Sequence, residues 1–219
     1  MHRTLWGFAT LLVLASFAPP AAAQTSAALP KFDAAVTVGV IAARPGEVDQ
    51  PYYQDWYQQG RYAGSIGYYF TKNMKVEFEH AWSGEGSRLL LEYQQVNGLP
   101  YTYQVEQFFQ LQQSTFRVVW QFRDNAWVHP YVSAGAVLDT EHQRYHVPLT
   151  FQSGPRGERV LVRSEMNSGD RYELRPGFSI AGGAKFYMSR RAFFNTGAIV
   201  THSSPASTVN FIAGFGFDW

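Results

Sequence analysis

Hydrophobic and polar residues alternate along most of the chain after Lys31, with a period close to two residues, which is the period of a β-strand. Eight alternating runs can be recognised, and each is about as long as the 9 to 11 residues with which a tilted strand crosses a bilayer. The runs cover residues 31–44, 61–70, 74–83, 114–123, 129–139, 177–188, 191–202 and 207–219. This succession of strands predicts an all-β protein.

The last run shows most clearly how the two faces of a predicted strand differ. Its apolar face consists of Val209, Phe211, Ala213, Phe215, Phe217 and Trp219. Its other face includes Asn210, Gly214, Gly216 and Asp218. Across the eight runs, the small and polar face is too sparse and too rich in glycine to form the exterior of a soluble barrel. We therefore expect the apolar faces to point outward into lipid and the polar faces to line the inside.

The connections between the predicted strands alternate in length. Tight turns at 71–73, 124–126 and 189–190 alternate with long connections after the first, third and fifth runs, as is typical of outer-membrane barrels. One long connection contains the hairpin signal Asn97-Gly98, and another contains the turn cluster 153–157 between alternating flanks. We expect both to continue beyond the membrane as paired strands. Aromatic residues gather near both ends of the predicted strands, as membrane interfaces favour.

The first 23 residues have the layout of a cleavable signal peptide. Arg3 precedes an apolar run over 5–17, and small alanines at 21–23 provide a cleavage site. The apolar run is shorter than the roughly 18 residues of a membrane-spanning helix. We therefore expect a signal peptide over 1–23, a periplasmic segment over 24–30, and a barrel domain over 31–219.

The composition narrows the functional classes. The chain of 219 residues is 46% hydrophobic, yet its mean hydropathy of -0.23 does not fit several apolar membrane helices. Its 18 Lys and Arg residues nearly balance its 17 Asp and Glu residues, so the chain lacks the net positive charge that is typical of nucleic-acid-binding proteins. The absence of cysteine excludes disulfides, thiolate zinc sites and cysteine catalysis.

Residues 31–219 resemble the small eight-stranded outer-membrane β-barrels of Gram-negative envelopes, the group similar to the transmembrane domain of outer membrane protein A and to outer membrane protein X. The most specific element is the C-terminal FIAGFGFDW, in which Phe215, Phe217 and Trp219 resemble the signal read by the barrel-assembly machinery. The segments HPYVSAGAV and FSIAGGAKFYMSRRAFF also resemble strand segments of the family. The resemblance implies an antiparallel up-and-down transmembrane barrel in the cell outer membrane.

An eight-stranded barrel has an interior just wide enough for side chains, so the charges on the polar faces should meet there. We expect an interior ion network of Glu77, Glu79, Arg117, Arg61 and Lys185, together with Asp33 and Asp218. Glu77 or Glu79 with Arg117 is the preferred pair, because buried charges are costly without a partner. The alternative, a narrow channel for small solutes, requires a wider barrel.

Metal and hydrolase chemistry has weaker support in the sequence. His142 and His146 would lie roughly 13 Å apart on a strand, too far to share one ion. His202-Ser203-Ser204 resembles the H-x-S motif of the outer-membrane lipid A deacylases, which would make His202 the base and Ser204 the nucleophile. That family continues with Asn where this chain has Pro205, and the last run contains no Glu to complete the triad.

These observations predict a non-enzymatic outer-membrane barrel without a cofactor or metal. It would strengthen the envelope or bind a partner through its long surface hairpins. The expected contacts are outer-membrane lipid and lipopolysaccharide, the barrel-assembly machinery, and an unidentified extracellular partner, with no nucleic acid. We expect a monomer. A lipid A deacylase-like enzyme and a narrow solute channel are the alternatives.

Overall fold

Eight strands form a closed ring in the computed structural model, which describes residues 31–44, 57–122, 127–204 and 206–219. The ring consists of β1 (Phe32–Arg44), β2 (Tyr57–Tyr69), β3 (Met74–Ser83), β5 (Leu99–Gln121), β6 (Val128–Val147), β10 (Arg171–Tyr187), β11 (Ala192–Ser203) and β12 (Ala206–Asp218). Four more strands lie beyond it: β4 (Gly86–Val96), β7 (Thr150–Ser153), β8 (Arg159–Arg163) and β9 (Met166–Asn167). The predicted signal peptide, the segment 24–30 and the predicted turn at 124–126 lie outside the described residues.

Every strand of the ring pairs antiparallel with its two neighbours, in the order β1-β2-β3-β5-β6-β10-β11-β12. Pairing of β1 with β12 closes the ring, with Asp33 opposite Asp218 and Val40 opposite Phe211. The closure is completed at its end by the Lys31 amide, which donates to the Trp219 carbonyl over 2.9 Å. The predicted eight-stranded up-and-down barrel is confirmed. The described residues contain no helix long and apolar enough to cross a membrane.

The outer surface of the ring is an apolar belt. On β1 the side chain of Val36 is 67% exposed whereas that of Asp33 is 2% exposed, so the predicted direction of the two faces is correct. Large apolar side chains face outward in this way on every strand of the ring. Such a surface on a barrel with a charged interior fits lipid and not water. We therefore treat the ring as membrane-spanning.

Stacked aromatic pairs mark both edges of the apolar belt. Tyr62 stacks on Trp82 at the long-loop edge, with ring centroids 5.7 Å apart, and Phe32 stacks on Trp219 at the other edge, at 6.1 Å. Tyr69 and Tyr187, which the sequence places near the short-turn ends of their strands, do not belong to this aromatic edge. Tyr69 is buried and donates to Asp33 over 3.0 Å, and Tyr187 donates to Asp218 over 2.6 Å, so both hydroxyls belong to the interior.

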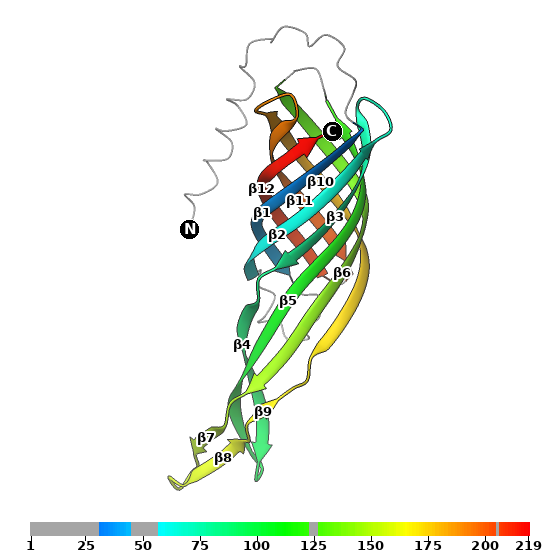
Figure 1. The fold of residues 1–219 in the computed structure, drawn as a ribbon. Coiled ribbons are helices and arrows are strands. Elements are labelled where there is room, and N and C mark those ends of the chain that lie inside the picture. Colours follow the sequence, from blue (N-terminus) through cyan, green and yellow to red (C-terminus); the bar gives the residue numbers. More distant parts are fainter. Residues whose placement is uncertain (1–30, 45–56, 123–126, 205) are drawn as a thin grey trace.

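Strands on the long-loop side are longer than predicted. The fourth predicted strand starts at residue 114 and the fifth ends at 139, whereas β5 begins at Leu99 and β6 continues to Val147. The belt ends at a row of paired residues on four neighbouring strands. Trp82 of β3 lies opposite Gln112 of β5, which lies opposite Thr140 of β6, which in turn lies opposite Leu174 of β10. Beyond that row the wall continues as a sheet with β4 and β9, which Figure 1 shows projecting far from the ring. We call residues 86–111 and 141–173 the extension.

The extension has an apolar core of its own. Tyr101, Tyr103, Val105, Val147 and Val162 are buried against one another, and β7 and β8 form a small hairpin over this cluster. Gln152 of the hairpin donates to the Thr102 carbonyl of β5. The turn at Asn97 and Gly98 has positive φ values of 52° and 78°, as a tight two-residue hairpin requires. The prediction that both long connections continue as paired strands is confirmed.

Candidate functional site

Charged side chains meet at the middle of the barrel interior, from β2, β3 and β5. Arg117 donates from Nε to Glu77 Oε1 over 2.8 Å and from Nη2 to Glu79 Oε2 over 3.0 Å. Arg61 donates from Nη2 to the other oxygen of Glu79 over 2.5 Å. Alternation along β3 turns both glutamates inward, and the register places Glu77 directly opposite Arg117. The structure thus brings together four of the five residues of the predicted network.

A second group of charges fills the interior toward the short-turn end. Asp33 accepts hydrogen bonds from Lys75 over 2.6 Å and from Lys185, the fifth predicted residue. Lys75 also pairs with Glu77 and so joins the two groups, while Lys185 lies 3.6 Å from Asp218. Lys75 was missing from the predicted network, although its place two residues before Glu77 on the polar face was a usable signal.

The charges of these two groups balance. Their acids are Asp33, Glu77, Glu79 and Asp218, and their bases are Arg61, Lys75, Arg117 and Lys185. Four negative charges therefore face four positive ones in a space from which water is largely excluded. Burying an unpaired ion costs several kcal/mol, so these pairs are what allows charged side chains to fill the interior. The arrangement is that of a structural ion network and not of a reactive site.

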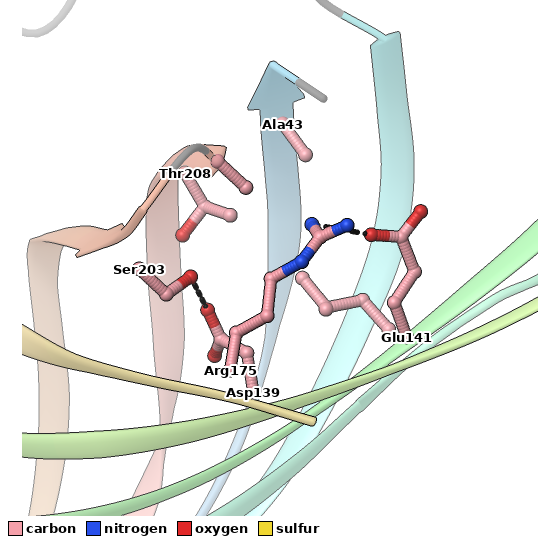
Figure 2. A pocket seen from close by; sticks show the side chains of 8 residues that line it. Ala43, Asp139, Glu141, Arg175, Ser203 and Thr208 are labelled. Carbon is pink, nitrogen blue, oxygen red and sulfur yellow. Dashed lines mark hydrogen bonds and ion pairs between the residues drawn. The ribbon is translucent and has the colours of Figure 1, made fainter. Parts of the chain in front are cut away.

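A smaller polar cluster closes the long-loop mouth of the barrel. Figure 2 shows the Arg175 guanidinium directed at Glu141, which it contacts over 2.8 Å, and Ser203 directed at Asp139. Gln113 also donates to Asp139, over 3.0 Å. The cavity between these side chains is about 10 Å³, which is room for one water molecule. The cluster therefore seals the mouth.

Little in the sequence pattern indicated this mouth cluster. Asp139 and Ser203 are 64 residues apart, and Arg175 precedes the sixth predicted strand. Arg175 also donates to Glu173 over 2.6 Å, beyond the belt. That hydrogen bond lowers the pKa of Glu173 below its ordinary value.

The residues of the hydrolase alternative are not brought together. His202 shares a hydrogen bond with Ser207 on β12, over 3.0 Å, whereas the sequence paired it with Ser204. Both His202 and Ser204 are exposed. His80 makes the same kind of cross-strand contact with Ser114, over 2.8 Å, so histidine–serine pairs recur on the outer wall. His142 and His146 contact Asp170 and Asn167.

The three residues of the predicted assembly signal face outward from β12 and the chain end. Phe215, Phe217 and Trp219 are all about half exposed, in line with the belt. Phe215 packs against Phe194 at 5.4 Å between ring centroids. A machinery that reads these aromatics would find them on the lipid side of the closing strand.

The surface of the extension carries large apolar side chains beyond the belt. Leu89, Leu91 and Tyr93 are exposed along one face of β4, and Leu149, Phe151 and Leu161 are exposed at the β7–β8 hairpin. Scattered apolar residues are common on protein surfaces, whereas contiguous exposed apolar stripes are typical of interaction surfaces. The extension is therefore the candidate binding surface.

Known structures share this architecture. The sequence matches no protein-family model and no curated protein. The structure of Neisserial surface protein A is similar, with a TM-score of 0.55 and 12% identity over 86% of this chain and 97% of that one. Outer membrane protein OprG from Pseudomonas aeruginosa gives a TM-score of 0.50 and 12% identity over 87% and 97%. At such identities the likeness shows the fold alone: this chain has the fold of the small eight-stranded outer-membrane β-barrels.

Proposed function

We propose that the protein resides in the outer membrane and acts in binding at the cell surface, with the barrel as anchor and the extension as binding surface. The observation that carries this proposal is the packed core of the extension beneath exposed apolar side chains. Ordering a long projecting sheet costs conformational entropy, which the cluster around Tyr103 and Val105 offsets. The role is non-enzymatic in this proposal.

The filled interior favours an anchor over a channel. Arg117, Glu77 and Glu79 cross the middle of the barrel as paired ions, and all are nearly buried. A solute would have to break these pairs, and separating a buried pair costs about 3–5 kcal/mol. The hydrolase alternative has less support because His202 contacts Ser207 and because Pro205 departs from the motif.

The register supplies a way to remove the extension without touching the barrel. Gly86 pairs with Phe109, and Gln143 pairs with Arg171, so each hairpin can be closed at these points. In the trimmed variant, Asn-Gly replaces residues 87–108 and residues 144–170. We expect both the full chain and the trimmed variant to reach the outer membrane and to shift on gels between boiled and unboiled samples.

Adhesion of bacteria that express either form tests the proposal, with wells coated with collagen, fibronectin or mucin. The full chain should increase adhesion to at least one coating, and the trimmed variant should return it to the vector level. Equal amounts of folded barrel in the two strains are the control. Unchanged adhesion after trimming contradicts the proposal, and if trimming instead raises detergent sensitivity, a role in envelope integrity is supported.

A further inference from the structure

The outer face of the extension contains a pocket of about 410 Å³, a size common among ligand sites. It lies between β5, β6 and the segment 167–170, and it is lined by Phe108, Arg144, Tyr145, His146, Asn167, Ser168, Gly169 and Asp170. Phe108 pairs with Arg144 four residues beyond Gln112 and Thr140. At about 3.4 Å per residue the pocket is roughly 13 Å along the strands from the edge of the belt, outside the hydrocarbon.

Hydrogen bonds hold the outer wall of this pocket in place. Asn167 contacts His146 over 2.7 Å, and Asp170 contacts His142 over 2.9 Å. Between them the Tyr145 amide donates to Ser168 Oγ over 2.8 Å, and the Ser168 amide donates to the Tyr145 carbonyl over 2.9 Å. The wall is therefore preorganised, which lowers the entropy cost of binding a ligand.

The charges around the pocket disfavour an anionic ligand. Arg144 lies over the Phe108 ring at 4.8 Å, and its guanidinium donates to both oxygens of Glu85, over 2.8 and 2.9 Å. Its positive charge is thus already offset, and Asp170 adds a carboxylate to the wall. Glu106 pairs with His146 in the sheet and adds another negative charge. A phosphate or sulfate needs unpaired cations, and among the described residues that line the pocket the only Lys or Arg is Arg144, which is already paired.

We infer that the pocket binds a neutral sugar unit. A sugar presents hydroxyl groups that both donate and accept, and the wall offers both kinds of partner. Arg144 and the Asn167 amide can donate, while Asp170 and the Asn167 carbonyl can accept. Phe108 is an apolar group of the lining that ring carbons can contact, although Arg144 lies over one face of its ring. This assignment rests on the proposed function, since it names the chemistry that the extension would recognise.

Gly169 provides a direct test. Gly169 lines the pocket and a Cβ built on it meets no atom within 4 Å, so Gly169→Tyr adds bulk at the lining without disturbing the wall. Gln95→Tyr places the same side chain on exposed β4 and serves as the matched control. Binding is measured by saturation-transfer NMR with D-glucose, D-galactose and N-acetyl-D-glucosamine, and glucose 6-phosphate is the anionic contrast. The full chain is held in lauryldimethylamine oxide, because glycoside detergents would compete.

At least one neutral sugar should bind the full chain and Gln95→Tyr alike, and Gly169→Tyr should weaken that binding at least tenfold. The inference is overturned if no neutral sugar binds, if Gly169→Tyr binds as well as the full chain, or if glucose 6-phosphate binds tenfold more tightly than glucose. In any of these cases adhesion that depends on the extension still stands, because the trimmed variant tests it separately.

A second experiment determines where the sugar comes from. The titration is repeated in phosphatidylcholine vesicles with and without lipopolysaccharide. Weaker binding of the soluble sugar in the lipopolysaccharide vesicles assigns the pocket to a glycolipid of the same membrane. Equal binding in both vesicles assigns it to a glycan presented by another surface, and either result keeps the sugar assignment.

Discussion

Lys185 on β10 donates to Asp33 on β1 across the barrel interior, although 152 residues separate them. Two strands, β11 and β12, lie between β10 and β1 along the wall. Asp33 also accepts from Lys75 on β3 and from Tyr69 on β2. One carboxylate thus ties together side chains from four strands.

We expect Asp33→Asn to destabilise the barrel by about 3–5 kcal/mol, because it leaves Lys75 and Lys185 buried with one negative charge fewer. The free energy of unfolding in urea, followed by tryptophan fluorescence in phosphatidylcholine vesicles, measures the effect. Asp170→Asn in the extension is the control, since its partner His142 is on the surface and such pairs contribute about 0–1 kcal/mol. Equal stability of the two variants would show that Asp33 is not a central member of the network.

The hairpin over the extension can be released without disturbing the barrel. Val162 is 2% exposed in the apolar cluster, whereas its neighbour Leu161 is 45% exposed on the opposite face of β8. Val162→Asp should detach the hairpin, because an unpaired carboxylate cannot stay in an apolar site. Limited trypsin digestion should then cut faster after Arg156 and Arg159, which flank Glu158 in the turn. Leu161→Asp should leave the rate within about twofold of the wild type, and a similar increase there would argue against specific packing.

The tight turn of the β4–β5 hairpin depends on its glycine. Gly98 has a φ of 78°, a conformation that costs a β-branched residue roughly 1–2 kcal/mol. Gly98→Val should therefore speed amide hydrogen exchange near the tip of β4 and β5 while exchange in the membrane-spanning strands stays unchanged. Gly60→Val is a matched control, because a Cβ there meets no atom within 4 Å and its φ is not positive. Unchanged exchange at the tip in Gly98→Val contradicts the prediction.

Acid should loosen the mouth of the barrel through Glu173. The hydrogen bond from Arg175 lowers the pKa of Glu173, so its ionised form is favoured in the folded state. Its contribution is therefore present above the unfolded-state pKa of about 4.5 and is lost as the pH falls below that value. Amide hydrogen exchange around β10, with rates corrected for their intrinsic pH dependence, should rise between pH 6 and pH 3. Glu173→Gln should flatten that rise, and a rise of equal size in this variant would assign it to other carboxyl groups.

All eight strands of the ring could be predicted because a strand imposes a period of two wherever one face meets lipid. The run 207–219 keeps this period without a break, and β12 occupies 206–218. Glutamines interrupt the apolar period just before residue 114, although Tyr101, Tyr103 and Val105 of β5 are buried in alternation, which is why the predicted run began only at 114. There Gln107, Gln110, Gln112 and Gln113 point to either face.

The neighbours inside the barrel were only partly predictable. Glu77 and Arg117 lie on strands that are consecutive in the ring, so the pair follows from strand order alone. The contact of Asp139 with Ser203 depends on the stagger of the whole ring, which no local pattern encodes. Tyr69 stands between Tyr68 and Phe70, and three aromatics in a row conceal which one turns inward.

The two longest strands, β5 and β6, pass from the extension into the membrane-spanning wall without a break, and they pair from Glu106–His146 down to Gln121–Tyr131. A pull on the extension would run along these strands and would load many parallel backbone hydrogen bonds at once in a shearing geometry. The hydrogen bonds would share the load, whereas a peeling force breaks them one after another. Under the proposed binding role, the continuous strands would carry the load of an attachment from the extension directly into the membrane-spanning wall.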